Sequence, residues 1–146
     1  MLDTGYWIQY PIKEGGTDMY VIDVSKIEGV KISAPYERVI KVLLAPDTQD
    51  IVKDISITMG ILAPHSQNDL HTHEGFEILY IISGFGKFVV DNKVYEIKSD
   101  YLLIAPPGVP HRQINESDDA MKMLAIWTPP VLGKDVIDRA LNALKS

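Results

Sequence analysis

The chain has no cysteine and only four histidines among its 146 residues. Without cysteine there are no disulfides and no thiolate chemistry, so packing holds the fold, and any bound metal must use nitrogen and oxygen ligands. The first residues show no basic segment followed by an apolar one, and no apolar run approaches the ~18 residues of a membrane helix. We therefore expect a cytoplasmic protein without a membrane-spanning segment.

Basic residues are also scarce. Fourteen Lys and Arg stand against twenty Asp and Glu, which gives a net charge of −6, and no basic cluster interrupts the acidic balance. Electrostatic attraction to a phosphate backbone is therefore disfavoured, and nucleic acid is not an expected partner. The length fits one domain, which at this size buries roughly 70% of the surface that its unfolded chain exposes.

Short apolar segments separated by turn residues run through the middle of the chain. Period-two alternation and turn signals such as S-G-F-G and D-N-K are typical of antiparallel strands. We expect strands at 38–44, 54–62, 76–82, 87–90, 94–97, 101–105 and 121–128. A sheet that closes into a barrel or sandwich removes its exposed edges and encloses an interior where a ligand can bind.

The last fourteen residues change to a helical period. One stripe of a predicted amphipathic helix is apolar, and it consists of Val136, Ile137, Ala140, Leu141 and Leu144. The sequence thus predicts an all-β barrel in a single domain, 1–146, with three parts. These are an N-terminal arm and strand at 1–34, the barrel at 35–128 and a C-terminal helix at 133–146.

Three of the four histidines lie in two short segments, H-T-H-E-G-F-E at 71–77 and P-P-G-V-P-H at 106–111. His71, His73 and Glu77 have odd numbers, so their side chains point the same way if one strand runs through them. A neighbouring strand could bring His111 opposite them. Three nitrogens and one oxygen suit a divalent transition metal (Fe, Mn, Ni or Zn), and an octahedral ion keeps two positions open for water or substrate.

The spacing of these residues is more specific than a lone H-x-H. The first segment reads H-x-H, three residues, Glu77, six residues, Gly84, and the second reads Pro106-x-Gly108-x-x-His111-x-x-x-Asn115. This pattern resembles the two motifs of the cupin superfamily over most of residues 60–128. The resemblance implies a double-stranded β-helix, or jelly roll, in which the two histidines and the glutamate of the first motif and the histidine of the second bind one metal. It also implies turns at the two glycines.

Two positions depart from the cupin pattern: His65 and Asp100 stand where the motifs open with glycine. Asp and Ser near these positions can stabilise turns through local hydrogen bonds, and neither change touches a proposed ligand. We interpret His65 as a solvated loop residue rather than an acid or base near the site. Asp69 and Arg112, beside the ligands, are interpreted as surface residues.

Strand parity also predicts a pocket wall. Lys122 is expected to point outward, which turns the odd residues of 121–128 inward. The expected lining is Gly75, Leu79, Ile81, Gln113, Asn115, Met123, Ala125, Trp127, Ile57 and Met59. Such a mainly apolar wall with a few polar groups is typical of a small-molecule site, and Gln113, Trp127 and Met59 are the candidate substrate-binding residues.

Two classes of function remain open. In the first, the chain is a metal-dependent enzyme (a dioxygenase, decarboxylase or lyase) that binds a small oxygen-bearing molecule, with Glu77 as the candidate catalytic residue, either a ligand throughout or one that releases to take a proton. In the second, the barrel is a non-catalytic binding or sensing module. A weaker alternative is a sugar isomerase or epimerase, which requires a more polar interior. The family resemblance also implies a homodimer, and strand exchange by the aromatic arm around Tyr6, Trp7 and Tyr10 is one route to it.

Overall fold

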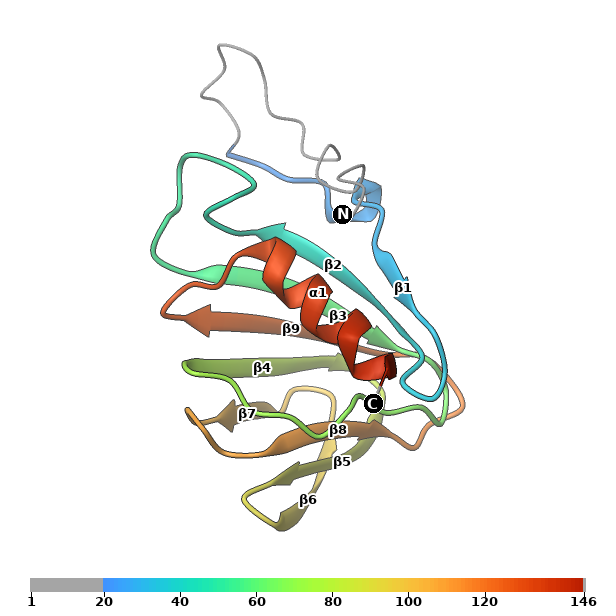
Figure 1. Cartoon of the computed structure of the whole chain (residues 1–146). Helices are drawn as coiled ribbons and strands as arrows, with labels where there is room; N and C mark the ends of the chain where they lie inside the picture. Colours follow the sequence, from blue (N-terminus) through green and yellow to red (C-terminus); the bar gives the residue numbers. More distant parts are fainter. Residues whose placement is uncertain (1–19, 146) are drawn as a thin grey trace.

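The computed structural model describes residues 20–145 (Figure 1). The predicted aromatic arm around Tyr6, Trp7 and Tyr10 lies outside the described residues. The described elements are β1 (Val30–Ile32), β2 (Arg38–Leu44), β3 (Ser56–Leu62), β4 (Phe76–Ser83), β5 (Phe85–Val90), β6 (Lys93–Lys98), β7 (Leu102–Ala105), β8 (His111–Asn115), β9 (Met121–Thr128), the helix α1 (Gly133–Asn142) and the short 3-10 turns η2 (Val24–Lys26) and η3 (Ala143–Lys145).

The strands form two antiparallel sheets. One sheet has six strands in the order β1-β2-β3-β9-β4-β7, and the other has three in the order β6-β5-β8. Neighbours such as β9 and β4 are far apart in the chain, which is how a jelly roll differs from a simple meander (Figure 1). The predicted all-β fold with a C-terminal helix is confirmed. Among residues 20–145, no helix has the length and apolar content needed to cross a membrane.

The main core lies between the two sheets. It joins Phe88 of β5 and Ile97 of β6 to side chains of β4, β7 and β9. On β9 the inward residues are the predicted odd-numbered ones, and Met121 among them is completely buried, whereas Lys122 is exposed. Parity of this kind follows from the pleat, which turns alternate side chains to opposite faces. A single outward lysine is therefore enough to orient the strand.

Strand β3 shows the opposite orientation from the one predicted. Its buried residues are Ser56, Thr58 and Leu62, whereas Ile57 and Met59 are only partly buried. The polar inner face is stabilised by hydrogen bonds, because the Ser56 hydroxyl donates to the Val131 carbonyl at 2.5 Å and accepts from its N–H at 2.9 Å. Ile57 and Met59 therefore belong to the outer face of β3, and the prediction that these two residues face the interior was wrong.

The helix α1 packs against the inner surface of β1 and β2, close to one end of the barrel (Figure 1). Ile137 and Ala140 of the predicted stripe are fully buried there. The carboxylate of Asp47, from the loop after β2, accepts hydrogen bonds from the first backbone N–H groups of the helix, at 2.8 Å from Gly133. This external cap fixes the start of α1 and so sets which helix residues reach the interior.

Candidate metal centre

The four predicted ligands meet at one point. One nitrogen from each of His71, His73 and His111 and one oxygen of Glu77 all lie within 4.8 Å of one another. The parity argument assumed one continuous strand through these residues, but the segment before β4 is irregular. His71 forms an isolated bridge with His111 of β8, His73 lies just before a bend at residues 74–75, and Glu77 lies on β4. The bridge consists of two backbone hydrogen bonds, 3.2 and 3.0 Å long. It holds the first and second motifs together.

Each histidine ring is fixed by a backbone carbonyl. The Nδ1 atoms of His71, His73 and His111 lie 2.8, 3.0 and 2.9 Å from the carbonyl oxygens of Asp69, Gly75 and Val109. A carbonyl oxygen only accepts, so Nδ1 carries the proton in each case, and in the neutral ring Nε2 presents a lone pair. The backbone thus selects the tautomer that metal-binding histidines need.

The donor atoms fit a divalent ion. The Nε2 atoms of His73 and His111 lie 3.1 and 3.2 Å from the same oxygen of Glu77. Two ligands bound at a right angle, each about 2.1 Å from an ion, are about 3 Å apart. Three lone pairs and a carboxylate that converge at this spacing repel one another unless a proton or a cation lies among them. The residues present therefore fit a bound metal, with His71, His73, Glu77 and His111 as its candidate ligands.

Burial and neighbouring charges favour the protonation states that such a site requires. Burial lowers the pKa of His71 to about 4, and the nearby positive charge of Arg139 acts in the same direction. For Glu77, burial alone would raise the pKa, but hydrogen bonds and positive charge from His111 and His73 outweigh it and lower the pKa to about 2. A cation among the four residues would stabilise the carboxylate in the same way. At neutral pH, His71 is therefore neutral and Glu77 is ionised.

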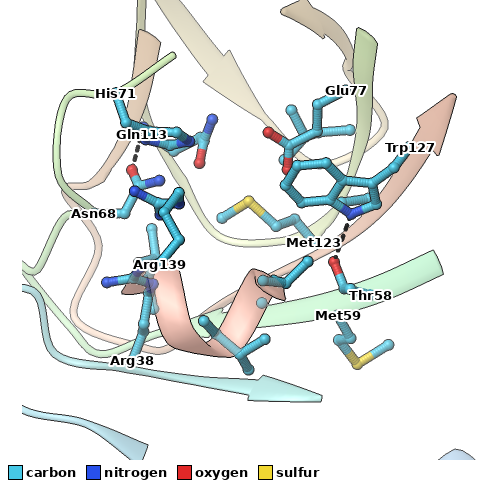
Figure 2. Close-up of a pocket in the computed structure, with 16 residues that line it drawn as sticks. Arg38, Thr58, Met59, Asn68, His71, Glu77, Gln113, Met123, Trp127 and Arg139 are labelled. Atoms are coloured by element: carbon cyan, nitrogen blue, oxygen red, sulfur yellow. Dashed lines mark hydrogen bonds between the residues drawn. The ribbon is translucent and has the colours of Figure 1, made fainter. Parts of the chain in front are cut away.

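A cavity of about 60 Å³ borders the cluster at His71 and Glu77. Figure 2 shows Trp127 on the same side as Glu77, with its indole N–H donating to the Thr58 hydroxyl at 3.1 Å. The Trp127 ring also lies against the His73 ring, with 4.9 Å between the centroids. This apolar wall excludes water from one side of the ligand cluster.

Comparison with known proteins identifies the family of this chain. The family model described as a cupin domain matches residues 58–127. The uncharacterized protein MJ1618 of Methanocaldococcus jannaschii is 32% identical over 122 residues, which is 80% of this chain and 96% of that protein. This chain is a cupin.

Two further similar proteins are named for an activity. The crystal structure of a predicted oxalate decarboxylase from Thermotoga maritima shares 27% identity and a TM-score of 0.66, and the match covers 75% of this chain and 98% of that one. The L-ectoine synthase of Rhodococcus opacus is 33% identical over 75 residues, 50% of this chain and 55% of the synthase. The chain therefore spans about half the length of this second relative.

The departures from the cupin motifs occur where the backbone is left-handed. His65 and Asp100, which stand in place of glycine, have φ angles of 57° and 72°. Gly84 and Gly108, the predicted turn glycines, have φ angles of 97° and 72°. The chain thus adopts a left-handed backbone at all four positions, including the two that have no glycine. Asp tolerates this region better than most residues, because its short polar side chain bonds locally.

His65 lies apart from the metal centre. Its side chain is 62% exposed, and its Nε2 lies 2.7 Å from the carboxylate of Asp118, which is also exposed. The interpretation of His65 as a solvated loop residue agrees with this position.

The pocket of this cupin is more polar than predicted. Leu79, Gln113, Met123, Ala125 and Trp127 line it as expected, whereas Met59 borders it with its side chain directed away from the pocket (Figure 2). Four of the ten expected lining residues are absent from the wall, and these are Ile57, Gly75, Ile81 and Asn115. Asn115 instead binds backbone, since its amide donates to the carbonyls of Leu62, Ala63 and Asp119. Residues that the sequence did not indicate take their place, namely Arg38, Ile40, Thr58, Gly60, Leu62, Asn68, Val136 and Arg139.

Asp69 is not the surface residue that was predicted. It is 8% exposed, and its carboxylate accepts a hydrogen bond from Arg139 at 2.8 Å and lies 3.6 Å from Arg38. Its backbone carbonyl holds the ring of His71. Asp69 therefore joins the metal centre to two arginines that come from β2 and α1. The sequence carried one weak signal for this, a charged residue two positions before a candidate ligand.

Proposed function

We propose that this cupin is a metal-dependent enzyme that acts on a small oxygen-bearing organic molecule. The observation that supports this proposal is the convergence of three carbonyl-fixed imidazoles and one ionised carboxylate beside a small, partly polar cavity. A bound Fe, Mn, Ni or Zn ion would supply Lewis-acid polarisation of a substrate oxygen and, for a redox-active ion, one-electron chemistry. Four protein ligands leave room in an octahedral shell for that substrate.

The surrounding residues define what the chain itself contributes. His71, His73 and His111 hold their rings in one tautomer, and Trp127 excludes water from one side. Glu77 is the one carboxylate lining the pocket in the described part of the chain. Its pKa of about 2 makes it a strong anionic ligand and a weak base. We therefore propose that Glu77 acts mainly as a ligand and that its catalytic role is to set the charge of the centre.

Decarboxylase, dioxygenase and lyase chemistry are the reaction types that this site could support. The likeness to the predicted oxalate decarboxylase of Thermotoga maritima favours decarboxylation among them. Decarboxylation also suits the small cavity, because a substrate of only a few heavy atoms can enter it. Fold alone does not decide between these reactions, so the test must measure turnover directly.

The test loads the purified protein with Mn, Fe, Ni or Zn in separate samples. Release of CO₂ from oxalate and 2-oxo acids, consumption of O₂ with diketones, and ammonia or alkene release for lyase activity are then measured. We expect turnover with at least one metal and a loss of 100-fold or more in His111→Ala. His65→Ala, which changes an exposed histidine, is the matched control and should keep full activity.

Two negative results have different meanings. Stoichiometric metal binding without turnover on any of these substrates would refute the enzyme proposal and favour a non-catalytic binding or sensing role. Failure to bind any of the four metals would refute the metal centre itself.

A homodimer is also proposed. The outer face of the six-stranded sheet exposes large apolar side chains within the described residues, namely Phe76, Tyr80, Leu102 and Ile104. Apolar patches of this kind on soluble proteins mark interaction surfaces. Sedimentation of the full chain as a dimer would support the proposal, and a monomeric profile at micromolar concentration would contradict it.

A further inference from the structure

Two guanidinium groups lie in the pocket wall beside the metal centre. Arg38 comes from the first residue of β2, and Arg139 comes from α1. Figure 2 shows them next to each other, on the side of the pocket away from Trp127. Both residues lie outside the range 58–127 that matches the cupin model, so the family pattern does not account for them.

The two arginines share a single carboxylate. Arg139 donates to both oxygens of Asp69, at 2.8 and 3.4 Å, and Arg38 lies 3.6 Å from one of them. A guanidinium has five N–H donors, and Arg38 uses one more on the backbone carbonyl of Tyr36, at 2.9 Å. Arg38 is only 5% exposed, and burial lowers its pKa to about 10 in spite of Asp69. The single carboxylate of Asp69 thus faces two guanidinium groups, of which Arg38 is buried and Arg139 is 33% exposed.

The charge balance of the loaded pocket is positive. Arg38 and Arg139 contribute +2, and Glu77 together with Asp69, which lies behind the two arginines, contributes −2. This group of residues is therefore neutral without an ion and would carry +2 with a divalent one. An anion that enters beside the arginines restores neutrality. In a cavity of about 60 Å³ that is lined mainly by buried or partly buried side chains, such compensation is stronger than in bulk water.

A third polar group points to the same ligand. Gln113 is 4% exposed and lines the pocket, and its side-chain Nε2 is buried without a hydrogen-bond partner. The backbone of Gln113 is held by Asn68, whose side chain accepts from its N–H at 2.7 Å. A buried donor without an acceptor is costly and uncommon in folded proteins. The unpartnered amide and the two guanidinium groups therefore offer donors to one cavity.

We propose that Arg38, Arg139 and Gln113 form a carboxylate-binding subsite, and that the substrate is a small organic acid. The part of this proposal that concerns the substrate rests on the proposed function. The acid's carboxylate lies on the arginines, and a neighbouring oxygen faces the cluster of His71, His73, Glu77 and His111. Planar guanidinium groups match the geometry of a carboxylate, which they can bind through two parallel hydrogen bonds.

The short distance between the subsite and the metal centre limits the size of the acid, and Asp69 shows that the two are adjacent. This residue holds Arg139 through its carboxylate and the ring of His71 through its backbone carbonyl, at 2.8 Å in each case. The subsite and the metal centre are therefore adjacent, in a cavity of about 60 Å³. A molecule with a carboxylate and an oxygen on the next carbon, such as oxalate or pyruvate, has the length to reach both.

The experiment measures binding rather than turnover, on the full chain loaded with Zn²⁺ as a redox-inert ion. Calorimetric titrations use pyruvate, oxalate, inorganic phosphate and acetylacetone, a chelating diketone without a carboxylate. We expect Arg139→Gln to weaken pyruvate and oxalate binding about tenfold or more and to leave acetylacetone binding within about twofold. Lys134→Gln removes an exposed positive charge from the same helix and should change neither.

Several results would overturn the subsite. Equal pyruvate affinity in wild type and Arg139→Gln would do so, and so would an equal loss for acetylacetone, which would indicate a structural defect. Phosphate binding more tightly than either acid would overturn the carboxylate assignment. Gln113→Leu, which removes the amide but not the charge, should also weaken acid binding.

Zinc content measured in the same samples separates the two proposals. A wild-type protein that takes up no zinc contradicts the proposed function. If the protein is fully loaded with zinc and Arg139→Gln binds the acids as tightly as wild type does, only the subsite is contradicted. Arg38→Lys is a second variant, which retains the positive charge but loses the planar guanidinium group. We expect this variant to bind oxalate more weakly than wild type does.

Discussion

The buried, neutral state of His71 predicts that the metal-free protein loses stability in mild acid. Burial and the charge of Arg139 hold the pKa of His71 at about 4, against an ordinary value of 6.5. In the unfolded chain this histidine takes up a proton as the pH falls below 6.5, whereas in the folded chain it does not until about pH 4. Its stabilising contribution is therefore complete above pH 6.5 and is lost as the pH falls towards 4.

The size of the effect follows from the two pKa values. One pKa unit corresponds to about 1.4 kcal/mol, and lowering the pH from 7 to 5 crosses about one and a half units of the difference. The free energy of unfolding should thus fall by about 2 kcal/mol over this interval on account of His71. The carboxyl groups contribute little, because their ordinary pKa values lie below pH 5.

The assay is urea denaturation of metal-free protein at pH 7 and pH 5, monitored by circular dichroism. In His71→Gln the pH-dependent loss should be about 2 kcal/mol smaller than in wild type. His65→Gln, which changes the exposed histidine, should behave as wild type in this respect. An identical pH dependence in wild type and His71→Gln would refute the reasoning.

The remaining predictions concern stability and can be measured by thermal or urea unfolding. Gly84→Ala should lower the free energy of unfolding by more than about 1 kcal/mol, because the φ of Gly84 is 97° and a Cβ would lie 2.9 Å from the Cα of Met121. Asp100→Gly should lower it by less than about 1 kcal/mol, because glycine adopts the φ of 72° without strain. Equal costs for these two changes would contradict the account. Trp127→Phe should cost about 1–2 kcal/mol by leaving the buried Thr58 hydroxyl without its donor, and an unchanged stability would show that this hydrogen bond contributes nothing.

The candidate ligands could be found from the sequence because their chemistry and spacing are both local. His71, His73 and Glu77 lie within seven residues, and His111 follows the proline-rich turn that starts β8. The convergence survives even though the chain bends between His73 and Glu77. The four residues therefore converge although the assumption of one continuous strand was wrong.

The inner face of β3 could not be predicted, because the usual rule places apolar residues inside. Here Thr58 faces inward, where its hydroxyl meets the Trp127 indole, and Ile57 and Met59 fall on the outer, partly apolar face. A strand with a polar pocket on one side and an apolar surface on the other shows the same alternation as an ordinary amphipathic strand, with the faces exchanged.

The arginines of the pocket were missed for a different reason. Arg38 begins an apolar strand and Arg139 lies beside the apolar stripe of α1, so each pattern has an ordinary structural explanation. Their shared carboxylate, Asp69, is remote from both in the chain. Only the docking of α1 on β1 and β2 brings the three together. The apolar stripe predicts that the helix packs against the sheet, but a single sequence does not show on which strands.

The most direct test of the metal centre is the metal content of protein purified without an affinity tag or chelator, measured by mass spectrometry beside a His73→Ala variant. We predict a near-stoichiometric amount of one divalent transition metal in wild type and its loss in the variant, with His65→Ala unchanged. A wild-type protein that contains no metal and takes up none of the added Mn, Fe, Ni or Zn would contradict the account.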